Sequence, residues 1–133
     1  MILIADNRLQ TAVELLAECE KIGLDKQHLI IDPLVVPVIW QDGQIQAGEV
    51  LPTIRNLPEV FGCEIRTVAG LSNLTAGTKG HPKRLLLEQV YLSMLAASGL
   101  DMVLLNIFHT ETVAAAKAGD ALIGENPFAW DGL

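Results

Sequence analysis

The chain has 133 residues, which favours a single domain, and half of its residues are hydrophobic. Its 16 acidic and 9 basic residues give a formal net charge of −7, which argues against binding to nucleic acids or to an anionic membrane surface. No apolar run reaches the roughly 20 residues of a membrane span, and the apolar start lacks the basic flank of a signal peptide. We therefore expect a cytoplasmic protein.

The cysteines and histidines do not predict a metal site. Cys19 lies in a helical pattern and Cys63 at the start of a strand pattern, so both are expected to be reduced thiols of the core. His28, His81 and His109 are far apart and show no ligand spacing.

Four strand–helix units are predicted in chain order. The first pairs a strand at Met1–Ala5 with a helix from Thr11 to about Gly23, where Thr11 and Glu14 have the spacing of a capping box. The second pairs a strand at His28–Asp32 with a helix at Glu49–Val60, which Pro58 should shorten or kink. The intervening residues 34–48 show no period and predict a long loop.

The third and fourth units follow the same order. The third has a strand at Glu64–Ala69, a polar loop at Gly70–Gly80 and a helix from Pro82 to Gly99. The fourth has a strand at Met102–Ile107 and an alanine-rich helix from Thr110 to Gly124. Strands that alternate with helices predict an α/β fold with a parallel sheet, and the apolar strands are typical of strands buried on both faces.

Short polar side chains collect where the predicted strands end. They are Asp6, Asn7, Asp32, Ser72, Asn73 and Asn106. Because ligands of parallel α/β folds bind at the carboxyl ends of the strands, these residues predict one shared pocket.

Two of the strand ends suggest a specific chemistry. The carboxylate of Asp32 can accept two parallel hydrogen bonds from a planar N–H pair, such as the 2-amino-pyrimidinone edge of a pterin. Gly70 permits close approach of a ligand, and the Asn73 amide can donate or accept. The alternatives are a turn cap at Asp32 and an ordinary Ser/Asn turn at residues 70–75.

Together these segments resemble a known family. The residues are Ile-Asp-Pro-Leu-Val-Val-Pro-Val at 31–38, Gly-Leu-Ser-Asn at 70–73, Arg84 at a helix start and Gly-Leu-Asp at 99–101. The ordered set resembles the methyltetrahydrofolate–corrinoid methyltransferases and the folate domain of cobalamin-dependent methionine synthase. The resemblance implies that residues 1–133 form a single partial pterin-binding domain, a half-barrel equivalent to strands five to eight of a (β/α)8 TIM barrel.

The resemblance also implies roles for individual residues. Asp32 would hold the pterin ring, and Asn73 would be the catalytic residue, with a hydrogen bond near N5 of the methyl donor. The methyl group would pass from a methyltetrahydrofolate-type donor to a cobalamin or other corrinoid on a partner protein. Further substrate-binding residues are expected at Gly70, Ser72, Asn7, Asn106 and Arg84.

Several alternatives stay open. Dihydropteroate synthase is a relative on the same barrel, but its motifs differ from the Leu34–Pro37 and Ser72–Leu74 segments. A half-barrel would leave open sheet edges and an uncovered apolar face, so we expect a homodimer, a separate chain with the missing half, or a remnant. A non-catalytic pterin-binding module or a vestigial protein without a ligand are the competing functions.

Overall fold

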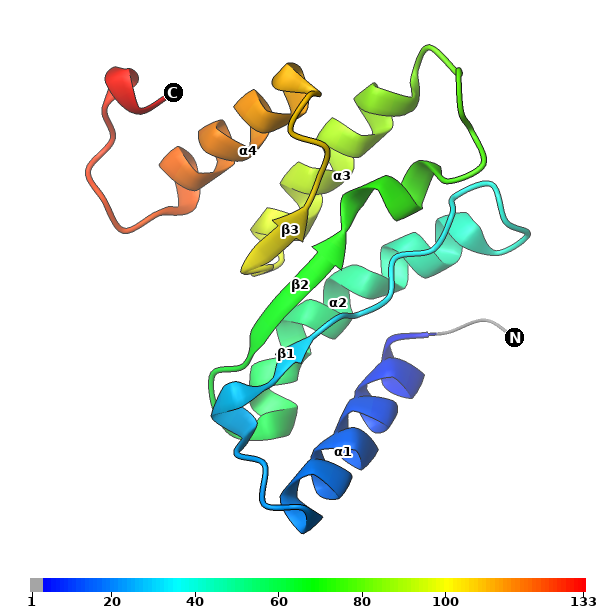
Figure 1. Cartoon of the computed structure of the whole chain (residues 1–133), viewed down its shortest axis with the longest axis vertical. Coiled ribbons are helices and arrows are strands. Elements are labelled where there is room, and N and C mark those ends of the chain that lie inside the picture. Colours follow the sequence, from blue (N-terminus) through cyan, green and yellow to red (C-terminus); the bar gives the residue numbers. More distant parts are fainter. Residues whose placement is uncertain (1–3) are drawn as a thin grey trace.

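The computed structural model describes residues 4–133, and four helices alternate with three parallel strands along the chain (Figure 1). The helices are α1 (Ala5–Lys21), α2 (Gly43–Phe61), α3 (Arg84–Ala97) and α4 (Thr110–Ile123). The strands are β1 (Ile30–Ile31), β2 (Arg66–Gly70) and β3 (Met102–Leu104). Short 3₁₀ helices lie at Lys26–His28, Leu71–Thr75 and Trp130–Gly132. No helix in this part of the chain is long and apolar enough to cross a membrane.

The predicted half-barrel of four β/α units is wrong, because the described residues form three strands. Residues 1–3 of the first predicted strand lie outside the described residues, and Ala5 is already the first residue of α1. The predicted helix start at Thr11 is also wrong. The Thr11 hydroxyl donates to the carbonyl oxygen of Asn7 at 2.9 Å, which is the bond of a threonine inside a helix and not of a cap.

The long loop predicted at residues 34–48 is shorter than expected. Helix α2 begins at Gly43, well before the predicted start at Glu49, and it contains both Pro52 and Pro58. A Cβ atom at Gly43 would lie 2.2 Å from the carbonyl oxygen of Pro37, so only glycine lets the preceding loop pack against the helix start. The same loop is tied to the next strand end, since the Val38 amide donates to the carbonyl oxygen of Leu74 at 2.8 Å.

The sheet is covered on one face. The strands pair in sequence order, β1-β2-β3. Because both crossover connections are expected to be right-handed, the connecting helices α2 and α3 lie on the same side of the sheet (Figure 1). Thr67 and Ala69 are buried on the helical side. On the other face Ile30 is 46% exposed and Leu104 is 67% exposed. The expectation of strands buried on both faces is therefore wrong.

Two apolar clusters hold the helices to the sheet. The larger lies between the sheet and α2 and α3, and includes Val50, Ala69, Leu71, Leu92 and Leu95. The smaller joins α1 to the far end of α2 and includes Ala12, Leu57, Phe61 and Ile65, with Cys63 packed against it. Cys19 and Cys63 are free, half-buried thiols. These clusters fix the strands, and with them the residues that follow each strand end.

Candidate functional site

The carboxyl ends of the three strands surround an open cavity of about 410 Å³. It is lined by Asp32, Gly70, Ser72, Asn73, Leu104, Leu105 and Asn106. The four polar side chains of this set are exposed to solvent. Five of the eight residues that the sequence predicted for the site thus share one cavity, because parallel strands bring their carboxyl ends to one edge of the sheet.

Asp32 is held by the backbone that follows it. The amide of Leu34 donates to Oδ1 of Asp32 at 2.8 Å, which forms a short turn and fixes the carboxylate at the cavity. A carboxylate offers roughly four lone-pair positions on its two oxygens. Asp32 therefore caps a turn and still has acceptors on both oxygens for a planar N–H pair.

Arg8 of α1 also holds this turn, through hydrogen bonds to its backbone. Its Nε donates to the carbonyl oxygen of Pro33 at 2.8 Å, and Nη2 donates to that of Leu34 at 3.3 Å. Leu34 has φ of 64°, a left-handed conformation that is strained for a residue with a side chain. The buried guanidinium therefore stabilises the unusual backbone that directs Asp32. Burial lowers the pKa of Arg8 from its ordinary value, and the negative charge of Glu49 opposes that shift.

Gly70 makes room for the Asn73 side chain. A Cβ atom at Gly70 would lie 2.9 Å from Nδ2 of Asn73, closer than such atoms approach in folded proteins. The backbone of Gly70 has φ of −85°, which any residue adopts, so a side chain here would disturb the position of Asn73 and not the backbone conformation. The 3₁₀ helix Leu71–Thr75 then carries Asn73 to the cavity, with Leu71 and Leu74 buried beneath it.

Asn106 belongs to a chain of polar contacts that leads away from the cavity. Its Nδ2 lies 3.3 Å from Nε2 of His109. On the other side of the ring, Nδ1 of His109 lies 4.0 Å from Oε2 of Glu88. The carboxylate of Glu88 is buried and accepts a hydrogen bond from the hydroxyl of Thr75. This series of polar contacts thus connects the segment after β3 to the segment after β2 through Glu88 of α3.

Three predicted site residues do not line the cavity. Asp6 and Asn7 lie in the first turn of α1, and their side chains are exposed. Arg84 is the first residue of α3, and its Nη2 lies 3.5 Å from Nε2 of His109. Among the residues that the structure describes, Arg84 is therefore connected to the cavity through His109.

Sequence reasoning missed Arg8, Glu88 and His109. A signal for two of them exists, because each is a charged residue at a buried position of a helix. Arg8 falls between Ala5 and Ala12 on the buried side of α1. Glu88 shares the buried stripe of α3 with Leu92 and Leu95. Buried charges are rare unless they are paired, so a charge in an apolar stripe indicates a specific partner.

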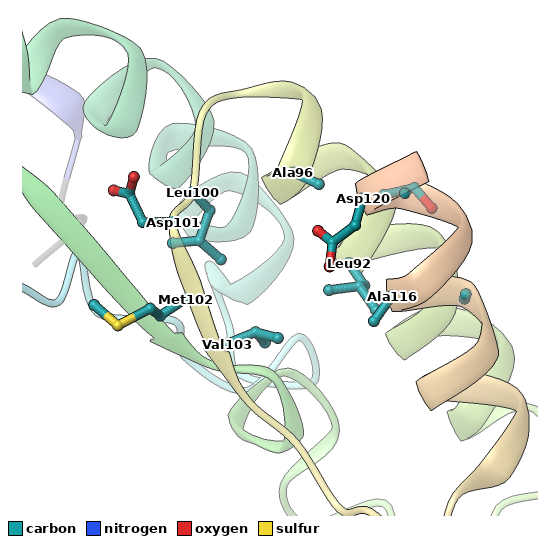
Figure 2. Close-up of a pocket in the computed structure, with 11 residues that line it drawn as sticks. Leu92, Ala96, Leu100, Asp101, Met102, Val103, Ala116 and Asp120 are labelled. Atoms are coloured by element: carbon teal, nitrogen blue, oxygen red, sulfur yellow. The ribbon is translucent and has the colours of Figure 1, made fainter. Parts of the chain in front are cut away.

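Two other cavities differ from the strand-end cavity in their lining. One of about 250 Å³ separates α3, α4 and the start of β3, and Figure 2 shows Leu92 and Ala116 beside it, with the Asp120 carboxylate turned towards it. Leu100 and Asp101, which precede β3, also line it, at the opposite end of the strand from Asn106. A second, mainly apolar cavity of about 320 Å³ lies between α1 and β1, behind the Asp32 turn. Neither gathers polar groups from several strand ends.

The site offers hydrogen-bonding groups and not a metal-binding set. Within residues 4–133, no group of three or more His, Cys, Asp or Glu side chains is arranged to hold a metal ion. The donors and acceptors at the cavity are one carboxylate, two amides and a hydroxyl, which suit a planar polar heterocycle. No family model matches the chain.

Proposed function

We propose that the chain binds a reduced pterin at the strand-end cavity and takes part in methyl transfer from N5 of a methyltetrahydrofolate-type donor to a corrinoid protein. The observation that carries this proposal is the meeting of Asp32 and Asn73 at one cavity, from the ends of two neighbouring strands. The role belongs to the cytoplasm, where the corrinoid partner is also expected.

The chemistry of Asp32 supports pterin recognition. The 2-amino-pyrimidinone edge of a pterin presents two parallel N–H groups, which a fixed carboxylate binds through both oxygens. The Leu34 amide and the buried Arg8 hold the Asp32 turn in advance of binding. A group that is already oriented loses less conformational entropy when the ligand binds.

The place of Asn73 supports a role in the transfer step. When the methyl group leaves N5, negative charge builds on that nitrogen, and a hydrogen-bond donor that strengthens in the transition state lowers the barrier. The Asn73 amide supplies such a donor, and the absence of a side chain at Gly70 leaves room for its Nδ2. The corrinoid of the partner protein would supply the electron pair that accepts the methyl group, and solvent would supply the proton that N5 gains.

A second candidate function is pterin binding without catalysis. It is favoured by the openness of the cavity, whose lining comes only from the ends of β1, β2 and β3. Efficient transfer requires exclusion of water, and an open cavity does not supply it alone. Binding without transfer, with every partner supplied, would select this candidate.

The binding test is calorimetric titration of the purified chain with 5-methyltetrahydrofolate near neutral pH. We expect Asp32→Asn to weaken binding about tenfold or more, since one N–H of the ligand loses its charged acceptor. Asp25→Asn is the matched control, because Asp25 forms the same kind of turn with the Gln27 amide at 2.9 Å, away from the cavity.

The transfer test follows the cobalt spectrum when free cob(I)alamin is mixed with the chain and 5-methyltetrahydrofolate. Asn73→Ala should slow methylation more than it weakens binding, since its donor acts in the transition state. Equal binding and equal transfer by wild type and Asn73→Ala would remove Asn73 from the proposal. No binding of any reduced folate by the wild-type chain would overturn the proposed function.

A further inference from the structure

The Asn106 amide has a defined orientation. Its Oδ1 accepts a hydrogen bond from the backbone amide of Phe108 at 2.9 Å, so Nδ2 is the end that faces His109. The carbonyl and amide ends of an asparagine differ in what they offer a ligand. With one N–H of Nδ2 turned towards His109, the second N–H remains available as a donor at the cavity.

The contacts of His109 determine its tautomer. Its Nε2 lies 3.3 Å from the Asn106 amide nitrogen and 3.5 Å from Nη2 of Arg84. A guanidinium has only donors, and the Asn106 nitrogen is a donor too, so Nε2 must act as the acceptor. A neutral His109 ring therefore carries its proton on Nδ1.

Glu88 faces that Nδ1 position. Its Oε2 lies 4.0 Å from Nδ1, which has no hydrogen-bond partner among the described residues. The carboxylate side chain is 4% exposed, and its oxygen is an acceptor that faces a proton placed on Nδ1 and not one placed on Nε2. The hydroxyl of Thr75 holds the other oxygen of Glu88 and so fixes the carboxylate.

We propose that Glu88 and His109 are positioning residues that hold one N–H of the Asn106 amide and so leave its second N–H for a ligand in the cavity. The inference rests on the proposed function for the identity of the ligand. Glu88 keeps the proton of His109 on Nδ1, which leaves Nε2 free to accept from Asn106. Asn106 then adds a third fixed group to the site, beside Asp32 and Asn73.

The first test needs no ligand. Long-range ¹⁵N–¹H spectra of the imidazole rings should show His109 protonated on Nδ1. His81 is an internal control of opposite kind, because its Nδ1 accepts from the Lys83 amide at 3.2 Å and its proton is expected on Nε2. In Glu88→Gln, the new amide donates towards Nδ1, and the His109 proton should move to Nε2. A wild-type His109 protonated on Nε2 would overturn the proposal.

The second test is a double-mutant cycle on 5-methyltetrahydrofolate affinity. We expect Glu88→Gln to weaken binding about fivefold and Asn106→Ala about tenfold. The double variant should bind no more weakly than Asn106→Ala alone, because Glu88 acts through Asn106. An equal loss from Glu88→Gln in both backgrounds would contradict the positioning role.

A third variant separates positioning from folding. His109→Gln keeps an oxygen acceptor for Asn106 and should retain more affinity than His109→Ala at comparable melting temperature. Equal affinity of these two variants would count against the proposal. If the wild-type chain binds no reduced folate, the proposed function fails, and the tautomer of His109 still decides whether Glu88 and His109 orient Asn106.

Discussion

Arg8 and Pro33 are joined by a hydrogen bond of 2.8 Å from the guanidinium Nε to the carbonyl oxygen, across 25 residues of sequence. The contact connects the first helix to the backbone directly after Asp32. Arg8 is 7% exposed, so its charge is removed from water and compensated by backbone carbonyls and by Glu49. The position of the Asp32 carboxylate, the group proposed to bind a pterin, therefore depends on a residue of α1.

Replacing Arg8 should loosen the Asp32 turn. Arg8→Met keeps the packing of the stem but removes the donors to Pro33 and Leu34, and we expect it to lower the free energy of unfolding by about 2 kcal/mol. It should also weaken 5-methyltetrahydrofolate binding. Urea unfolding measures the first effect and calorimetry the second.

Arg66→Met is the control for that variant. Arg66 is exposed and donates to the carbonyl oxygen of Gln27 at 3.4 Å, so its loss should cost less than about 0.5 kcal/mol. Equal losses from the two variants would mean that Arg8 has no special role at the turn.

Adding a methyl group at Gly70 should displace the Asn73 amide. The expected Cβ position lies 2.9 Å from Nδ2, and a flexible side chain yields more readily than backbone. Gly70→Ala should therefore weaken binding about tenfold with little change in stability. Gly48→Ala, in α2, meets nothing within 4 Å and should raise the free energy of unfolding by about 0.5–1 kcal/mol without affecting binding. Unchanged affinity in Gly70→Ala would show that Asn73 does not need its present position.

The parts of the fold that follow from local pattern were predictable. The apolar strand segments after residue 28 are visible in sequence, and parallel strands dictate that Asp32, Asn73 and Asn106 meet at one edge.

The inner face of α3 was not predictable, because the helix is apolar almost all round and buries Tyr91 and Leu92 while Leu86 and Val90 are exposed. The start of α1 was not predictable. An apolar run that ends at Ala5 suggests a strand, whereas the helix begins at that residue.

The supporting residues of the site required the structure. Arg8 and Glu88 are buried by contacts with residues far away in sequence, Pro33 for one and Thr75 and His109 for the other. A single sequence shows that each charge stands in an apolar stripe, but not which group compensates it. Tertiary contacts decide such pairings, and local propensity does not encode them.

Thr67 should contribute to stability through Asp101. The Thr67 hydroxyl donates to Oδ2 of Asp101 at 2.9 Å and accepts from the Asp101 amide at 3.2 Å, which joins β2 to the residue before β3. We expect Thr67→Val to cost about 1.5 kcal/mol in urea unfolding, since both bonds are lost at constant shape. Thr112→Val is the control, because the equally buried Thr112 hydroxyl has no partner among the residues described, and its removal should be neutral or stabilising. The same cost for both would refute the role of the Thr67–Asp101 pair.

Tyr91 should make the fold sensitive to alkali. Burial raises the pKa of its hydroxyl well above the ordinary value, and the nearby charge of Arg8 acts in the opposite direction. The unfolded chain loses this proton near pH 10, whereas the folded chain keeps it. The contribution of Tyr91 is therefore fully present below about pH 10 and declines as the pH rises towards the folded pKa, by up to about 1.4 kcal/mol per pH unit.

The comparison with Tyr91→Phe isolates this effect. Phenylalanine loses the hydrogen bond from the hydroxyl to the Ala47 carbonyl oxygen at 2.8 Å, so the variant should be about 1 kcal/mol less stable at neutral pH. Above about pH 10 the difference should shrink and then reverse, because phenylalanine has no proton to lose. Tyr91 is the single tyrosine of the chain, so tyrosinate absorbance reports this residue alone, and its ionisation should coincide with loss of helical circular dichroism. Ionisation at the ordinary tyrosine pKa in a chain that stays folded would show that the hydroxyl is not buried against α2.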